Sequence, residues 1–535
     1  MTPGMQFRLW LRGASRGQVG GTVAVVAAVL ALLLGSVSQG STKAADDAGF
    51  SSLDGGSPAV SGTTGGSTST TGALPSTQTP VTPGGAGSGG TSGTTGTSFG
   101  TTGGTTATGT TGTTAPGTST AGTPGAPAFD LTKATDRGIN NCSGVKTCVK
   151  LGVLIAKIGG LDQSGFALNL RGDIVQVVTA FINDQNKRGG LNGRPIVPVF
   201  RDTDPIDEND QNQACTQFTQ DDKVFAVLDT AAFIFANPQK CFTVTNRTPY
   251  IHGYAESEAF MDAGLGLDVS ETRSLDRIAI EWADEMGKLG FLKGGEKVGI
   301  LEDNCEPSHS VVDKYLVTGI KKLKVASVKT YASDCSAAYA QSQPPALMQQ
   351  MCVDGVTHVV LATSFVAAQT FLQAADGSPC GTGPAKFTYM ASDYSLLAGD
   401  LFTRNFSKTQ FDGSLAITNF YTGITKGSAR QAACSKILVA AGLPGLNNTY
   451  PNADANAFCD YFAIFVKASL ATGPNLTRVG WAKAVQNLGV YEGAFSPRSD
   501  YRPGKTSGGE LVHAMIWHAD CTCYRQSGPL HTGVG

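Results

Sequence analysis

Charged and aromatic side chains follow several β-rich runs after residue 148, where loops at strand ends could meet a ligand. The carboxylates of Asp303 and Asp393 could pair with a cation, and the ammonium group of Lys157 with an anion. The rings that could stack on an apolar body are those of Phe233, Tyr254, Phe365 and Tyr394. These residue types predict a small, partly apolar ligand with a hydrogen-bonding or cationic group.

Some of these side chains also have a purely structural interpretation. An aspartate at a strand end, such as Asp303 or Asp393, often caps the helix that follows. Phe233 can pack beneath its own loop, and His252, which ends an apolar run, can be a hydrogen-bonded histidine of the core. Both interpretations stay open at the level of the sequence.

Catalytic and metal-binding motifs give no positive signal. The six histidines form no HExxH motif and no Ser/His/Asp set with supporting context. The GxSxG pattern of serine hydrolases occurs at Gly96 to Gly100, but no predicted strand precedes it and no predicted helix follows it. Zinc-like spacing is approached at Cys521 and Cys523 near His518, without a full ligand set. The sequence therefore predicts a protein that is not an enzyme and has no cofactor and no metal site.

The start of the chain has the composition of an export signal. Residues 1–18 contain Arg8, Arg12 and Arg16 and no acidic residue, and residues 19–37 are apolar and uncharged. Such a segment is either a signal peptide or a membrane anchor. In both cases we expect the rest of the chain outside the cytoplasm, tethered to the membrane or secreted.

Residues 40–128 consist almost entirely of Gly, Ser, Thr, Pro and Ala, which predicts a disordered tether. It could be a simple spacer or an O-glycosylated stalk. The whole chain is nearly neutral, with 40 Lys plus Arg against 42 Asp plus Glu. Because the basic residues form no stripe with interleaved aromatics, nucleic acid is not an expected partner.

All twelve cysteines lie between Cys142 and Cys523, and an even number in an exported domain predicts disulfides. The sequence alone does not fix which cysteines pair. Pairing between near neighbours would join Cys142 with Cys148, Cys215 with Cys241, Cys305 with Cys335, Cys352 with Cys380, Cys434 with Cys459, and Cys521 with Cys523.

From residue 149 onward, β-rich runs alternate with helical patterns. This alternation predicts parallel sheets covered by helices on both faces. Two sets of such units, separated near residues 265–273, predict two similar α/β lobes.

The segment from Val149 to Asp202 carries the most specific motif. A strand and a glycine-punctuated loop lead into a helix that contains INDQN, and the phrase GGLNGRPI then precedes a second strand. This pattern resembles the extracytoplasmic solute-binding proteins of the branched-chain amino-acid-binding (Leu/Ile/Val-binding) type. The resemblance implies the type I periplasmic-binding fold, in which two α/β lobes, each a parallel sheet sandwiched by helices, are joined by three crossovers. It would place residues 148–268 and 420–490 in lobe one and residues 269–419 and 491–535 in lobe two.

The same resemblance implies a ligand held between the lobes by loops at strand ends. Members of that family usually carry two Ser or Thr residues after the third strand, where this chain reads Asp229-Thr230-Ala231-Ala232-Phe233 and Thr230 could substitute. Asp303-Asn304 match the family's Asp-rich loop, and Asp393-Tyr394 match its later Gly-Asp turn. The complete candidate ligand site is Lys157, Thr230, Ala231, Phe233, His252, Tyr254, Asp303, Asn304, Phe365, Asp393 and Tyr394.

The function implied by the resemblance is that of an exported, membrane-tethered solute-binding protein. It would trap a small molecule, an amino acid or a similar solute, by closing the two lobes on it. It would then deliver the solute to an ABC-type membrane permease and its ATPase. The alternative is a surface sensory or interaction module that kept the fold without an uptake role, which the altered loop at Thr230 and the long tether favour.

Overall fold

The computed structural model describes residues 147–157, 170–205, 207–230, 236–335 and 341–534. Residues 1–18, the apolar segment 19–37 and the tether 40–128 lie outside the described residues, as do Cys142, Ala231 and Phe233. Within the described part of the chain, no helix combines the length and the apolar character that crossing a membrane requires.

The first sheet is entirely parallel and has the strand order β2-β1-β3-β4-β5. Its strands are β1 (Val149–Ala156), β2 (Ile196–Thr203), β3 (Ala226–Asp229), β4 (Tyr250–His252) and β5 (Asp268–Ser270). The central strands are buried on both faces, which is why they read as apolar runs rather than as alternating patterns.

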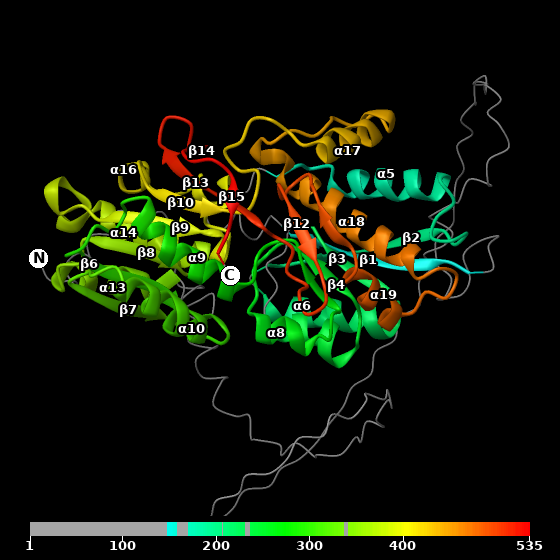
Figure 1. The fold of residues 1–535 in the computed structure, drawn as a ribbon, viewed down its shortest axis with the longest axis horizontal. Helices are drawn as coiled ribbons and strands as arrows, with labels where there is room; N and C mark the ends of the chain where they lie inside the picture. The colour runs from blue at the N-terminus through cyan, green and yellow to red at the C-terminus, as the bar shows by residue number, and fades with distance from the viewer. Residues whose placement is uncertain (1–146, 158–169, 206, 231–235, 336–340, 535) are drawn as a thin grey trace, which may run out of the picture. The chain divides into compact units, whose positions relative to one another are not determined.

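Helices cover both faces of this sheet (Figure 1). One face carries α5 (Ile174–Lys187), α17 (Ala429–Ala440), α18 (Ala453–Ala471) and α19 (Arg478–Val485). The other face carries α6 (Glu208–Thr216) and α7 (Ala236–Lys240), and α8 (Glu258–Ala263) leads from β4 to β5. Helix α5 buries Val177, Val178 and Phe181 at helical spacing, and the chain leaves the helix through Gly189 and Gly190, whose φ angles are positive.

The second sheet has the order β14-β13-β10-β9-β8-β6-β7, with β15 paired to β13. Its strands are β6 (Lys297–Asp303), β7 (Ser327–Ser333), β8 (His358–Ala362), β9 (Thr388–Ser392), β10 (Leu415–Thr418), β13 (Leu511–His518), β14 (Cys523–Gln526) and β15 (His531–Thr532). Strands β6 to β10 are parallel, whereas β13, β14 and β15 form an antiparallel edge. The sequence predicted the parallel strands β6 to β9, and it missed both β10 and this edge.

Helices also cover both faces of the second sheet. One face carries α13 (Pro344–Val353), α14 (Phe365–Asp376), α15 (Asp400–Thr403) and α16 (Lys408–Phe411). The other carries α9 (Leu275–Lys288), α10 (Ser308–Val311) and α11 (Thr318–Lys321). Ser274 caps α9 by accepting a hydrogen bond from the Arg277 amide, a contact that typically stabilises a helix by about 1 kcal/mol.

The chain passes between the two sheets three times: from β5 to α9, from β10 to α17, and from β12 to β13. The hairpin of β11 (Gly489–Tyr491) and β12 (Ser499–Tyr501) precedes the third crossing. Tyr491 and Tyr501 stack with ring centroids 6.0 Å apart, and both rings pack against the hydrophobic core of the first sheet. The Tyr501 hydroxyl also donates a hydrogen bond to the backbone carbonyl of Ser270 in β5. Residues 491–501, assigned to lobe two from the sequence, therefore pack with lobe one.

Five disulfides join described cysteines that are near neighbours in the sequence. They are Cys215–Cys241, Cys305–Cys335, Cys352–Cys380, Cys434–Cys459 and Cys521–Cys523. Cys148 is also disulfide-bonded. These bonds match the near-neighbour scheme at the five pairs that the structure describes.

Candidate ligand-binding site

A cavity of about 980 Å³, its open mouth included, lies where loops of both sheets meet. Asp229, Thr230, Gly253 and Tyr254 reach it from the ends of β3 and β4, and Asp393 reaches it from the end of β9. Most of the remaining wall comes from α15, α18, the second crossover at residues 420–422, and the segments that contain Asn448 and Phe495. This is where ligands bind in open parallel sheets, beyond the carboxyl ends of the strands.

Asp229 anchors one side of the cavity through a chain of hydrogen bonds. Its carboxylate accepts from the Tyr250 hydroxyl, and that hydroxyl accepts from the Tyr254 hydroxyl at 2.9 Å. Tyr254 itself lines the cavity. These two hydrogen bonds hold the Asp229 carboxylate and the Tyr254 hydroxyl in fixed positions at the end of the first sheet.

Asp393 occupies the corresponding place at the end of the second sheet. One carboxylate oxygen accepts from the Thr418 hydroxyl at 2.9 Å and the other from the Asn419 amide at 2.6 Å. Burial nevertheless dominates and raises the pKa of Asp393 to about 7, although these hydrogen bonds and nearby Arg273 favour the charged form.

Two more aspartates face the cavity from helices. Asp400 accepts from the Tyr524 amide at 2.7 Å, and Asp454 accepts from the Ala455 amide at 2.7 Å. Burial raises the pKa of Asp400 to about 6 and that of Asp454 to about 7. A ligand that carries positive charge would offset this desolvation and favour the ionised carboxylates.

Aromatic rings form the apolar part of the wall. Phe420 and Phe495 stack with centroids 4.2 Å apart, and Phe402 and Tyr421 also line the cavity. Tyr461, from α18, approaches Gly253 so closely that a Cβ at residue 253 would lie 1.9 Å from the tyrosine hydroxyl oxygen. Glycine is therefore required at residue 253 for Tyr461 to keep this position.

The described lining contains acids and no bases. None of the described residues that line the cavity is Lys, Arg or His. The segments 158–169 and 231–235, which follow β1 and β3 in the sequence, contain no Lys or Arg either. Arg404 lies close enough to Asp400, and Arg171 close enough to Asp454, to lower the pKa of each carboxyl slightly, but neither arginine lines the cavity.

Three of the residues predicted from the sequence lie together in the cavity wall: Thr230, Tyr254 and Asp393. The Thr230 hydroxyl donates its proton to the Leu154 carbonyl at 2.7 Å, so this hydroxyl can accept a hydrogen bond from a ligand but cannot donate one while that contact is kept. Ala231 and Phe233 lie outside the described residues, and their predicted role stays a prediction.

The other predicted residues lie elsewhere in the structure. Lys157 pairs with Asp210 at 2.8 Å, and His252 is fully buried against Asp268 at 2.8 Å. Asp303 accepts hydrogen bonds from the Thr363 hydroxyl and the Ser364 amide. The backbone amide of Asn304 donates to the Ser333 carbonyl, and the Tyr394 hydroxyl donates to the Ser308 carbonyl. The ring of Phe365 stacks on that of Phe402. His252 is thus a hydrogen-bonded histidine of the core, whereas Asp303 does not cap α10, the helix after its own strand, and instead contacts residues that follow β8.

Sequence reasoning missed Asp400, Asp454, Tyr421 and Tyr461. Asp229 was not predicted either, although the sequence could have indicated it, because it directly precedes Thr230 at a strand end. The other four lie on crossovers and helices, whose approach to the cavity depends on the packing of both lobes.

Comparison with known proteins relates this fold to solute-binding proteins. No protein-family model matches the sequence, and no curated protein matches it. A solute-binding protein of an ABC transporter from Rhodopseudomonas palustris BisB5, in complex with 3,4-dihydroxybenzoic acid, matches with a TM-score of 0.54 and 13% identity, covering 72% of this chain and 98% of that chain.

Two further solved structures each match 72% of this chain. A leucine-binding protein from Thermotoga maritima MSB8 has a TM-score of 0.55 and 13% identity, covering 72% of this chain and 99% of that chain. A branched-chain amino-acid ABC transporter protein from Thermus thermophilus with bound valine has a TM-score of 0.55 and 16% identity, covering 72% of this chain and 97% of that chain.

The two helix-flanked sheets and the three crossovers define the type I periplasmic-binding fold. The chain has this fold, as the sequence predicted. Among proteins of this fold, it resembles the branched-chain amino-acid-binding type.

Proposed function

We propose that this protein binds a small cationic solute with an apolar or aromatic part in the cavity between its lobes. The observation that carries the proposal is the lining of the cavity: four aspartates, several aromatic rings and, among the described residues, no basic side chain. Ion pairing with carboxylates and stacking on aromatic faces together recognise organic amines and quaternary ammonium groups.

A carboxylate-bearing ligand is a poorer fit for this cavity. The ligands named for two of the similar structures, 3,4-dihydroxybenzoic acid and valine, both carry a carboxyl group. In this protein such a group would face Asp229, Asp393, Asp400 and Asp454, and the Thr230 hydroxyl already donates to the protein backbone. Like charges in a partly desolvated cavity repel each other strongly.

The test is a binding screen with the full chain kept under oxidising conditions. The panel pairs each amine with an anionic or neutral analogue of similar size: polyamines, choline-like ammonium compounds and aromatic amines against benzoate, leucine and sugars. At 100 times its dissociation constant, a ligand should stabilise the native state by about 2.7 kcal/mol, which raises the melting temperature by a few degrees. Binding of benzoate or leucine with no response to any amine would contradict the proposed charge preference.

The proposal includes delivery of the solute to an ABC-type permease by an exported, tethered protein. The descriptions of the similar structures as ABC-transporter binding proteins support this role, and so does the apolar segment 19–37. Uptake of a labelled cationic ligand by cells that produce the full chain should fall when Asp400→Asn is introduced. Uptake that is unaffected although binding is weakened would favour a surface sensory role instead.

A further inference from the structure

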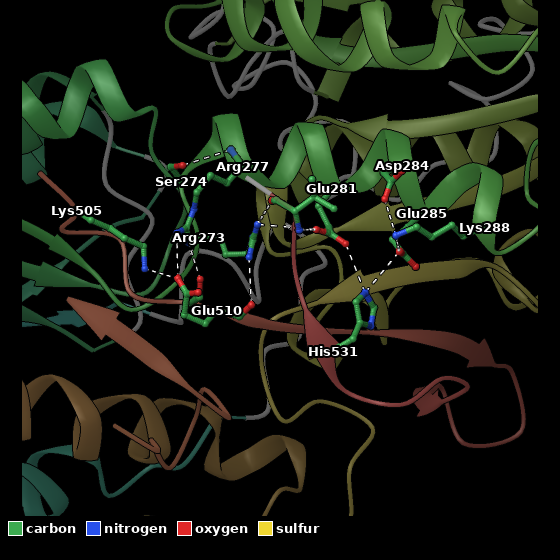
Figure 2. A network of polar contacts seen from close by, with 12 residues as sticks. Arg273, Ser274, Arg277, Glu281, Asp284, Glu285, Lys288, Lys505, Glu510 and His531 are labelled. Atoms are coloured by element: carbon green, nitrogen blue, oxygen red, sulfur yellow. Dashed lines mark hydrogen bonds and ion pairs between the residues drawn. The ribbon is translucent and has the colours of Figure 1, made fainter. Parts of the chain in front are cut away.

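A second polar cluster lies on the second lobe, in the network of Figure 2. Glu281 and Glu285 are one turn apart on α9, and both face His531 of β15. The Nε2 atom of His531 lies 3.5 Å from Oε1 of Glu281 and 3.5 Å from Oε1 of Glu285. The glutamate side chains are only 1% and 4% exposed.

The fold brings these three residues together from distant parts of the chain. Residues four apart on a helix share one face, which places both glutamates on the same side of α9. His531 pairs with Val512 of β13, and the neighbouring Val534 amide donates to the Glu281 carboxylate. The C-terminal strand is thereby held against α9.

The cluster contains electron-pair donors that have no hydrogen-bond partner. Oε1 of Glu281 and Nε2 of His531 are both buried and unpaired in hydrogen bonds. The other histidine nitrogen, Nδ1, lies 3.3 Å from the Pro529 carbonyl, which can only accept, so Nδ1 carries a proton. In the neutral ring, Nε2 therefore directs its lone pair toward two carboxylates.

A cation or a shared proton at the centre would stabilise this arrangement, and its dimensions fit a metal ion. Ligand atoms at ~2.1 Å from a tetrahedral zinc ion lie about 3.4 Å from one another. The three candidate ligand atoms lie within 4.8 Å of one another, and two of the separations are 3.5 Å. A backbone carbonyl that holds the far nitrogen of a histidine is a common feature of metal sites.

We propose that Glu281, Glu285 and His531 bind a divalent transition-metal ion such as Zn²⁺. An imidazole nitrogen with two carboxylates suits zinc, iron, cobalt or nickel better than magnesium or calcium, which prefer oxygen ligands alone. The imidazole is 36% exposed, so one edge of the ring reaches solvent although Nε2 itself is buried.

Two basic side chains border the cluster without filling its centre. Lys288 Nζ lies 2.9 Å from Oε1 of Glu285, but it also contacts Asp284 and is half exposed, so it can stay with Asp284 when Glu285 binds metal. Arg273 approaches the other oxygen of Glu281 at 3.9 Å and donates to the Val534 carbonyl. The gap between Glu281 Oε1 and His531 Nε2 receives neither of them.

The experiment uses the full chain, purified without a polyhistidine tag, stripped with a chelator and titrated with Zn²⁺ and Co²⁺. We expect one ion per chain, with Co²⁺ giving the visible absorption of a low-coordinate site and Zn²⁺ displacing it. His531→Ala should weaken binding by at least roughly tenfold, the loss seen even for groups that only support a metal ligand.

His309→Ala is the matched control. His309 is 37% exposed and also lies between two carboxylates, but Glu302 is nearest its Nδ1 at 3.3 Å and Asp313 its Nε2 at 3.7 Å. A single ion cannot use both contacts, so this variant should bind metal like the parent.

Glu285→Gln guards against a loss that reflects loosening of β15 rather than loss of a ligand. It should reduce zinc affinity while the metal-free melting temperature stays close to that of the parent. No binding by the parent chain, unchanged affinity in His531→Ala, or an equal loss in His309→Ala would each overturn the proposal. If a proton rather than a metal ion occupies the centre of the cluster, the parent chain should bind no metal.

Discussion

Two groups of carboxylates in this protein are arranged in different ways. The four aspartates of the cavity come from separate loops and helices and line the same space as several aromatic rings. The two glutamates of α9 lie one turn apart, and with His531 they place three ligand atoms within 4.8 Å of one another. In both groups most of the carboxylates are buried, namely Asp229, Asp393, Asp454, Glu281 and Glu285, which makes uncompensated negative charge unfavourable.

The difference shows how spacing determines which cation a set of acids can accept. Widely spread carboxylates with aromatic neighbours match an organic cation that fills space and stacks. Closely spaced carboxylates with an imidazole match a single ion with short bonds. Arg273 lies near Asp393 and also approaches Glu281, so we expect independent binding at the two groups for changes away from this arginine, such as those at Gly253 and Asp400.

The largest expected effect comes from Gly253→Ala. The added methyl group would lie 1.9 Å from the Tyr461 hydroxyl oxygen and would force the ring to move within the cavity wall. If the ligand needs the ring in its original position, binding must restore the steric conflict, and the upper end of the usual overpacking cost, about 3 kcal/mol, then corresponds to roughly 100-fold in affinity. Titration calorimetry measures this loss, and zinc binding should not change.

A rescue variant decides whether steric conflict is the cause. Adding Tyr461→Phe removes the conflicting oxygen and leaves the Cζ carbon, 3.1 Å from the new methyl group, as the nearest ring atom. The double variant should recover most of the lost affinity. If it binds as poorly as Gly253→Ala alone, the assigned contact is wrong.

Asp400→Asn is expected to have the next largest effect. It removes one charge from the cavity but keeps an oxygen that can accept from the Tyr524 amide. Loss of a charged contact to the ligand should cost about 2 kcal/mol, or roughly 30-fold in affinity.

The control for this change is Asp303→Asn. Asp303 was a predicted ligand contact, but in the structure it accepts from Thr363 and Ser364 and does not line the cavity. We expect the control to bind the ligand like the parent. Equal weakening in both variants would mean that the site extends to Asp303, as the sequence predicted.

A smaller effect is expected from pH. Burial raises the pKa of Asp393 and Asp454 to about 7 and of Asp400 to about 6, despite nearby Arg273, Arg171 and Arg404. A bound cation favours the charged carboxylates, so binding releases protons, and affinity should fall by roughly tenfold as the pH drops from 7.5 to 6. Calorimetry in buffers of different ionisation enthalpy detects the released protons.

The stability of the ligand-free protein should respond to pH in the opposite direction. Because burial raises the folded-state pKa of these acids from 3.8 to about 6 or 7, protonation favours the folded state at low pH, and this stabilisation is lost progressively as the pH rises from about 4 to about 7. The Asp400→Asn variant should show a weaker fall in melting temperature over this range. An anionic ligand would bind better at low pH, which would reverse the affinity trend and contradict the proposed function.

The smallest effect is expected from Lys288→Gln. Lys288 competes for the Glu285 oxygen, yet it is about half exposed, and such surface ion pairs contribute less than about 1 kcal/mol. Its removal should therefore raise zinc affinity by only a few fold and leave binding in the cavity unchanged. A decrease in zinc affinity would indicate that Lys288 supports the cluster rather than competing for it.

The parts of the fold that the sequence predicted are those determined by local patterns. The alternation around β1, α5 and β2 and the motif GGLNGRPI were sufficient to predict the α/β lobes and the type I periplasmic-binding fold. The antiparallel edge of β13, β14 and β15 was missed. Strand β13 pairs with β10, which lies about a hundred residues earlier in the sequence, and β14 and β15 are short strands that pair only with β13.

The site was less predictable for the same physical reason. Thr230, Tyr254 and Asp393 could be found because they follow strands whose ends meet at one edge of a sheet. Asp454 and Tyr461 lie on α18, a helix that is buried on nearly all sides, and nothing in its apolar sequence indicates which side chains reach the cavity. His531 lies far along the chain from Glu281, so no sequence motif joins the two.

The disulfides described above have a mechanical consequence. Each of the five bonds between described cysteines joins two residues that belong to the same lobe. Rotation of one lobe against the other therefore stretches none of these five bonds. A reducing agent would lower the stability of each lobe but would break no covalent link between the lobes among these five bonds. In a pulling experiment, oxidation should shorten the chain length released when each lobe unravels, while the force needed to open a ligand-bound cavity stays the same.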